Sequence, residues 1–196
     1  MPITSLVILM DTEKQKKFNI YFFSFFLYCL IGWVYEVLLE YFKFHHGFVN
    51  RGFLYGPYLP VYGFGAILIL FLLKDFAYKK RYIKKFNVSP ILSFIIIFFV
   101  STIVEYLTGY VLRQFGIKLW DYSNYKYNFD SLICLSASIR FAIGGTFFLY
   151  ALQPLFTKFI KKVPLKTQNI FTVIIFIILV TDLILTLKMR VFGGAL

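Results

Sequence analysis

The chain has 196 residues, of which 60% are hydrophobic, 22% aromatic and 15% charged, and its mean hydropathy is +0.75. Because too few polar residues are present to cover a compact surface in water, the composition excludes a soluble globular domain. The net charge of +12 is concentrated in short segments between apolar runs. This pattern favours contact with anionic lipid over nucleic-acid binding.

Five apolar runs follow one another, each close to the ~20 residues with which a helix crosses ~30 Å of hydrocarbon. They are Phe18–Tyr35, Tyr55–Leu73, Ile91–Leu112, Leu132–Phe156 and Ile170–Leu187. Membrane β-strands would be shorter and would alternate polar and apolar residues. We therefore predict an all-α, polytopic bundle of about five transmembrane helices, with residues 1–17 as an N-terminal segment and 18–196 as one membrane domain.

The cations predict the orientation of this bundle. Thirteen of the 21 Lys and Arg residues precede the first run or follow the second and fourth runs, and seven lie on the alternate side. The positive-inside rule then places the N-terminus in the cytoplasm. The apolar segment Ile3–Met10 is followed by charges rather than preceded by them, so it does not match a secretory signal peptide. It is interpreted as an interfacial segment or as residues ahead of the native start.

The first outer loop is the most informative segment. It reads Asn-Arg-Gly-Phe-Leu-Tyr-Gly-Pro from Asn50 to Pro57 and continues with further Gly, Pro and Tyr residues to Gly65. Gly permits positive φ and Pro restricts φ, so this punctuation predicts specific turns rather than a generic linker. We expect a shaped lid or mouth at the membrane surface, with Arg51 as its fixed charge and Tyr55 and Tyr62 as binding residues.

The second outer loop, 113–131, is rich in aromatic and amide side chains, and Trp120, Asp121 and Asn128 are its candidate binding residues. The inner loops are short and lysine-rich, with no sign of a folded domain.

Four ionisable residues are predicted within the membrane, where a charge costs at least ~2.5–3.5 kcal/mol and marks a functional site by default. Glu36 lies about 5 Å deep when the first span is taken to end at Leu39, and Glu105, Arg140 and Asp182 lie about 10, 12 and 8 Å from the outer ends of their runs, so all four fall in the outer half. Small or polar residues accompany them at four-residue spacing, as in Ser101/Glu105/Gly109 and Ser136/Arg140/Gly144. Two interpretations remain open: a Glu105–Arg140 ion pair that only fixes packing, or a polar pocket that opens outward.

Several kinds of chemistry lack their motifs. No Gly is followed by Lys, so a Walker A loop is absent, and no paired-Cys metal motif or nucleophile elbow occurs. The tandem His45-His46 has no convincing third ligand nearby, and Cys29 and Cys134 fit apolar thiols better than a disulfide. We predict neither a metal nor a cofactor, and any ATP would be hydrolysed by a partner.

Spaced motifs between Phe18 and Tyr150 resemble the Putative ABC-transporter type IV family of bacterial membrane proteins. The matching segments are Gly32–Glu36, Val49–Pro57, Tyr62–Gly65, Glu105–Gly109, Leu119–Ser123, Asn128 and Ile133–Leu135. The resemblance implies a multi-pass, permease-like component of a bacterial cell membrane.

Three functional hypotheses follow. The favoured one is a transport component whose outward-facing polar pocket takes a small solute or ion, with lipids and a second copy or an ATPase as partners. The second is an intramembrane enzyme at the outer leaflet, with Glu36, Glu105 or Asp121 as base and Arg51 as phosphate ligand. The third is a membrane scaffold, which would tolerate neutral replacement of its charges but not of its loop glycines.

Overall fold

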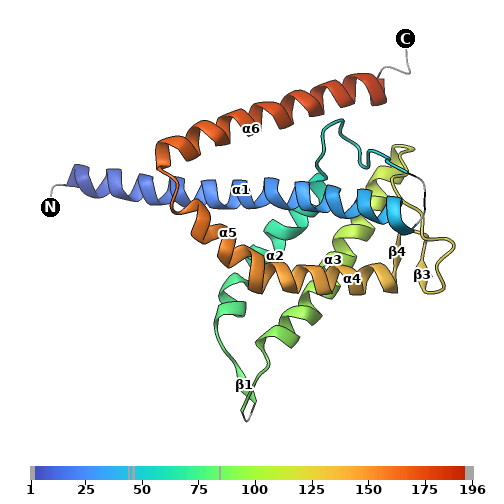
Figure 1. Cartoon of the computed structure of the whole chain (residues 1–196), viewed down its shortest axis with the longest axis horizontal. Coiled ribbons are helices and arrows are strands. Elements are labelled where there is room, and N and C mark those ends of the chain that lie inside the picture. The colour runs from blue at the N-terminus through green and yellow to red at the C-terminus, as the bar shows by residue number, and fades with distance from the viewer. Residues whose placement is uncertain (1–2, 44, 46, 84, 193–196) are drawn as a thin grey trace. The chain divides into compact units, whose positions relative to one another are not determined.

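The computed structural model describes residues 3–192 except 44, 46 and 84 (Figure 1). Five helical segments in this part of the chain are long and apolar enough to cross a membrane, which confirms the predicted architecture. They are Thr12–Phe42, Pro60–Tyr78, Ser89–Gln114, Leu135–Ile160 and Leu165–Arg190. Helices are the expected form, because a chain in hydrocarbon must satisfy its backbone hydrogen bonds within each segment.

The chain divides into two compact units. Unit 1 comprises Met1–Pro60 and Phe156–Leu196, and unit 2 comprises Val61–Leu155. Unit 1 contains α1 (Ile3–Lys43), the first loop, the end of α5 (Gln153–Ile160), α6 (Leu165–Thr186) and the π-helical turn η2 (Leu187–Phe192). Unit 2 contains α2 (Pro60–Tyr78), β1 (Tyr82–Ile83), β2 (Phe86–Asn87), α3 (Ser89–Gln114), β3 (Asn128–Phe129), β4 (Ile133–Cys134), α4 (Leu135–Phe147) and the π-helical turn η1 (Phe148–Leu152).

In unit 1, α1 runs without interruption across residue 17, and α6 begins directly after Pro164. The two helices point the same way and separate toward their C-terminal ends, where the first loop lies between them (Figure 1). Most apolar side chains of α6 are exposed, whereas its buried residues are Gln168, Thr172, Asp182 and Thr186. This inside-out arrangement suits a helix that faces lipid on one side and a polar partner on the other.

An amide cluster joins the N-terminal parts of α1 and α6. The fully buried Asn19 donates to Asn169 Oδ1 at 2.7 Å and accepts from Thr172 Oγ1 at 3.2 Å. Gln168 donates to the carbonyls of Ile160 (3.0 Å) and Val163 (2.9 Å), at the turn before α6. Because interhelical hydrogen bonds hold helices together in lipid, this cluster explains why α1 and α6 pack closely at this end.

In unit 2, α3 and α4 pack along faces of small residues. Ser93, Ile97, Glu105 and Gly109 are buried on α3 at multiples of four, as the sequence predicts for its Glu105 face. On α4 the buried residues are Ala137, Ser138 and Ala142, whereas Ser136 is exposed. The packed face of α4 is therefore offset from the predicted Ser136/Arg140/Gly144 stripe.

Two contacts explain this offset. Ser138 accepts a hydrogen bond from Thr102 at 2.8 Å, which joins α3 to α4. A Cβ on Gly145 would lie 2.7 Å from Ile97, so the close approach of the two helices requires glycine there.

Candidate functional site

The first loop, which joins α1 to α2, folds into the space between α1 and α6 of unit 1. Its buried residues Leu54 and Tyr58 form a cluster with Cys29 of α1, and Leu179 of α6 packs against them. The Leu59 N–H donates to the Cys29 carbonyl at 3.0 Å, and the Tyr58 ring lies 6.0 Å from that of Phe26. The predicted second apolar run began at Tyr55, but the helix starts at Pro60, and residues 55–59 belong to this docked loop.

Asp182 of α6 anchors the loop. Its Oδ1 accepts from the Tyr55 N–H at 3.1 Å and from Thr186 Oγ1 at 3.1 Å. Its Oδ2 accepts from the Gly56 N–H at 2.8 Å and from the Tyr58 hydroxyl at 2.5 Å. Four donors fill the acceptor sites of an ionised carboxylate, so the loop supplies the solvation that water would otherwise provide.

Burial, reinforced by the hydrogen bond to Asp182, raises the pKa of Tyr58. The phenol therefore keeps its proton and remains a donor at neutral pH.

Two glycines make this turn possible. Gly52 has φ +110°, a conformation that side-chain-bearing residues rarely adopt, and a Cβ there would overlap Leu59. A Cβ on Gly56 would overlap the ring of Tyr58. The glycine punctuation thus serves the approach of the loop backbone to a carboxylate on another helix.

Polar contacts hold the ends of the loop. Asn50 accepts from Trp33 Nε1 at 2.7 Å and donates to the Tyr55 carbonyl at 2.9 Å. Arg51 lies 3.5 Å from Glu40, near the C-terminal end of α1. Arg51 was expected as a fixed charge at a pocket mouth; its guanidinium is half-buried beside this acid.

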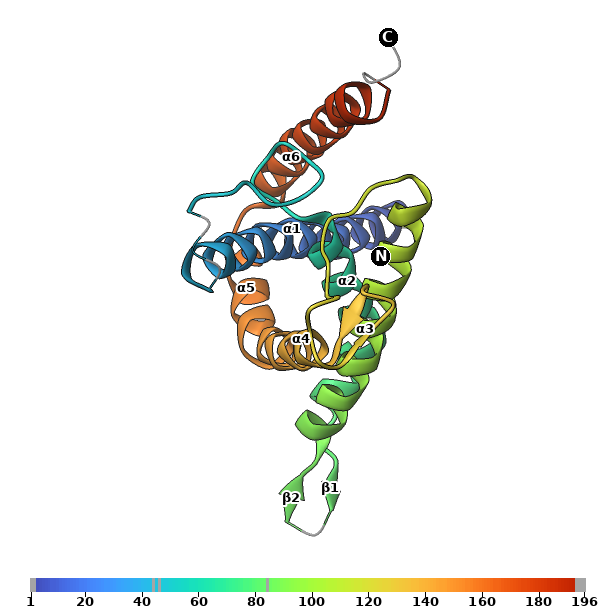
Figure 2. The same cartoon turned by 90° about the vertical axis from the view of Figure 1, so that its right-hand side faces the viewer.

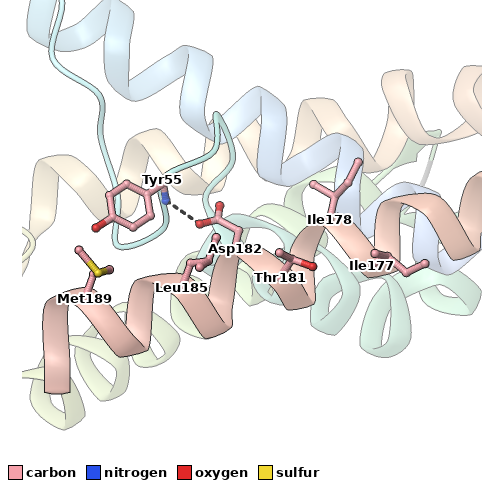
Figure 3. A pocket seen from close by; sticks show the side chains of 7 residues that line it. All are labelled: Tyr55, Ile177, Ile178, Thr181, Asp182, Leu185 and Met189. Carbon is pink, nitrogen blue, oxygen red and sulfur yellow. Dashed lines mark hydrogen bonds between the residues drawn. The ribbon is translucent and has the colours of Figure 1, made fainter. Parts of the chain in front are cut away.

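A hollow of about 580 Å³ lies beside the anchored carboxylate. Figure 3 shows its lining residues, which are Tyr55, Ile177, Ile178, Thr181, Asp182, Leu185 and Met189. Arg190 stands over the Tyr55 ring, with its guanidinium carbon 4.8 Å from the ring centroid. The hollow therefore combines a mainly apolar wall, one carboxylate and an aromatic rim with a cation beside it.

Unit 2 contains a second carboxylate bonded by a loop tyrosine. Buried Glu105 of α3 accepts from the Tyr122 hydroxyl at 2.7 Å through Oε1. Trp120 donates to the Leu132 carbonyl at 2.8 Å, and a Cβ on Gly109 would lie 3.0 Å from atoms of both residues. The second loop, which follows α3, is thus packed closely onto α3 beside Glu105.

Ion pairs at the surface tie this loop further. Lys118 donates to Asp121 at 2.5 Å, and the Ser123 N–H donates to the same carboxylate at 2.8 Å. Together these contacts lower the pKa of Asp121 to about 2. Arg113 donates two hydrogen bonds to Asp130, at 2.9 and 2.6 Å, and lowers its pKa. A carboxyl with a pKa near 2 is a weak base at neutral pH, which disfavours Asp121 as a general base.

The other predicted residues are not brought together. Tyr62 lies in unit 2, where its ring is 5.7 Å from that of Phe141, and the Asn128 amide donates to the Tyr125 carbonyl at 2.7 Å. Within the described part of the chain, half-buried Arg140 takes part in no hydrogen bond or ion pair, so the Glu105–Arg140 pair is not formed. Glu36 is half-buried on α1.

No group of three His, Cys, Asp or Glu side chains that could hold a metal occurs among the described residues, and His46 lies outside them. Cys29 and Cys134 are both buried and are not joined in a disulfide.

Sequence reasoning missed the donors Tyr58 and Tyr122 and the acceptor Asn19. A sequence signal for the buried face of α6 was available, because polar residues stand at positions 168, 172, 182 and 186 of this otherwise apolar helix. The sequence prediction concentrated on charged residues and did not use this pattern.

Comparison with known proteins supports the resemblance seen in the motifs. Neither the curated proteins nor the solved structures include a match to the chain. The model of one family, described as Putative ABC-transporter type IV, matches residues 23–187, which include both loop-anchored carboxylates. The chain therefore belongs to the Putative ABC-transporter type IV family.

Proposed function

We propose that this chain is the membrane-spanning component of a transport system and that the hollow beside Asp182 is its solute site. Family membership and five apolar helices support a transporter-like membrane protein. The proposal depends mainly on one observation: Asp182, which accepts hydrogen bonds from the first loop, also lines an open hollow of about 580 Å³. That volume lies within the ~300–1,000 Å³ range of small-molecule sites.

The lining indicates the class of solute. Ile177, Ile178, Leu185 and Met189 present an apolar wall, and Thr181 and Asp182 offer hydroxyl and carboxylate oxygens. These groups suit a small solute with an apolar body and one cationic or hydrogen-bond-donating group. Such a group would compete with the Tyr55 and Gly56 N–H donors for Asp182, so binding would loosen the loop.

Orientation and coupling complete the proposal. The distribution of Lys and Arg supports an orientation in which this loop faces the outside of the cell, and the family resemblance supports a bacterial cell membrane. Because the sequence has no Walker A loop, energy would come from a separate ATPase or from a gradient across a self-associated assembly. Affinity purification from cross-linked membranes tests for such a partner.

The solute site is tested by filling the hollow without touching the carboxylate. Ile178 and Ile184 are both exposed on α6, but only Ile178 lines the hollow. Cells that produce the wild-type chain should differ from empty-vector cells in the content of at least one small solute, as measured by mass spectrometry. Ile178→Trp should abolish the difference and Ile184→Trp should keep it.

Two outcomes contradict the proposal. If production of the chain changes no solute, the transport function is wrong. If Ile178→Trp and Ile184→Trp behave alike, the hollow is not the site.

A further inference from the structure

A small β-hairpin joins α2 to α3 in unit 2, where the sequence suggested only a short lysine-rich loop. β1 and β2 pair antiparallel, with Tyr82 opposite Asn87 and Ile83 opposite Phe86. The Arg81 N–H donates to Ser89 Oγ at 3.0 Å, and Ser89 Oγ donates to the Lys79 carbonyl at 2.9 Å. Figures 1 and 2 both show the hairpin continuing beyond the ends of α2 and α3.

Arg81 stiffens the base of this hairpin. Its guanidinium donates to the Phe76 carbonyl at 2.7 Å and lies 3.7 Å from the centroid of the Phe76 ring. The side chain folds back onto α2 and does not extend along the hairpin. It therefore orients the strands, while the neighbouring lysines Lys79, Lys80 and Lys85 are exposed.

The hairpin exposes apolar side chains on both of its faces. Tyr82, Ile83 and Phe86 are 59%, 64% and 77% exposed, and because Tyr82 and Ile83 are successive residues of one strand, they point to opposite faces. Large apolar side chains on both faces of a two-stranded hairpin do not suit full immersion in water. Aromatic rings between lysines are typical of the membrane–water interface.

Lengths place the hairpin in the headgroup layer. α2 has 19 residues and spans about 28 Å, close to the ~30 Å hydrocarbon thickness, so the hairpin begins at the hydrocarbon edge. Two residues per strand extend about 7 Å. The headgroup layer on each side of a bilayer is about 5–8 Å thick. We propose that β1 and β2 with their flanking lysines form a binding site for anionic phospholipid headgroups, with Lys79, Lys80 and Lys85 meeting phosphates and Tyr82, Ile83 and Phe86 lying at the acyl boundary.

Single-site labelling tests this proposal on the full chain. Cys29 and Cys134 are 0% and 3% exposed, so F86C introduces one accessible thiol for the fluorophore NBD. The labelled protein is placed in nanodiscs of phosphatidylcholine alone or with phosphatidylglycerol, and bleaching by dithionite is measured. Because a lysine at an anionic surface changes partitioning by about fivefold, bleaching should slow about fivefold or more when phosphatidylglycerol is present.

Two charge variants complete the test. The triple variant K79Q/K80Q/K85Q should restore the faster bleaching seen in phosphatidylcholine. The matched triple variant K158Q/K161Q/K162Q, which removes the same charge from exposed positions of unit 1, should not. Equal, water-like bleaching in both lipids would overturn the proposal and favour docking of a protein partner. Slowing that survives the hairpin triple would also overturn it, because the lysines would then have no role. The transport proposal is unaffected by either result.

Discussion

The first loop, in unit 1, and the second loop, in unit 2, make the same kind of hydrogen bond with different consequences. In unit 1, Tyr58 donates to Asp182, and in unit 2, Tyr122 donates to Glu105. Asp182 also receives two backbone N–H groups and lines an open hollow, whereas the loop beside Glu105 is packed against Gly109 through Trp120 and Leu132. In both units, a carboxylate on a membrane helix therefore accepts hydrogen bonds that hold the neighbouring loop in place. The units differ in the space beside the carboxylate: Asp182 borders an open hollow and is a candidate site, whereas the loop beside Glu105 is closely packed.

The largest expected effect is loss of the first loop's fold in Gly52→Ala. A non-glycine residue at φ +110° is strained by about 1–3 kcal/mol, and the added methyl also overlaps Leu59. We expect destabilisation of about 3 kcal/mol, measured by thermal unfolding in detergent, with faster proteolysis of the loop. Gly65→Ala is the control, because a Cβ there meets open space. A wild-type melting temperature for Gly52→Ala would contradict the described turn.

Gly109→Ala makes the corresponding change in unit 2. Its Cβ would lie 3.0 Å from Trp120 and Leu132, so overpacking should cost about 2 kcal/mol. Gly144→Ala in α4, where the Cβ meets nothing within 4 Å, should be neutral or slightly stabilising. Gly109→Ala should lower stability and leave the cellular solute content as in the wild type. If it instead abolished the solute difference from empty-vector cells without lowering stability, the solute site would lie in unit 2.

The paired variants Tyr58→Phe and Tyr122→Phe each remove one donor from a carboxylate, at an expected cost of about 1–2 kcal/mol. Only Tyr58→Phe should also impair transport. The folded-state pKa of Tyr58 is raised, so its contribution is complete below pH 10 and is lost as pH rises further. Stability measured between pH 8 and 11 should therefore fall more in the wild type than in Tyr58→Phe. Identical pH profiles would show that the phenol does not bond Asp182.

The smallest effect concerns Asp121 in the second loop. Its folded-state pKa of about 2 lies below its usual value near 4, so its contribution is present above pH 4 and lost as pH falls toward 2. Protection factors of residues 117–132, which correct for the intrinsic pH dependence of amide exchange, should fall over that interval in the wild type. They should fall less in Asp121→Asn, where Asp130 still titrates beside Arg113. A wild-type change centred above pH 5 would point to another group.

The membrane architecture could be predicted from the sequence because it depends on the length and polarity of single segments. The five apolar runs, the single charge in each of the last three and the special character of residues 50–60 are all local properties. Helical periodicity also predicted that Gly109 lies on the same face of α3 as Glu105. The boundary at Tyr55 was misplaced because apolar loop residues cannot be told from helix residues by hydropathy when they are buried by tertiary contacts.

What only the tertiary structure decided is which residues meet. Asp182 could be recognised as a costly charge, but its partners lie more than a hundred positions away in the first loop. Arg51 and Glu40, Tyr62 and Phe141, and Ser138 and Thr102 are likewise pairs that depth estimates could not choose. The sequence determined the set of spans and the punctuated loop, because hydrocarbon acts on each segment separately. Packing decided that the loop solvates one carboxylate, because only a folded backbone can aim two N–H groups and a phenol at the same atoms.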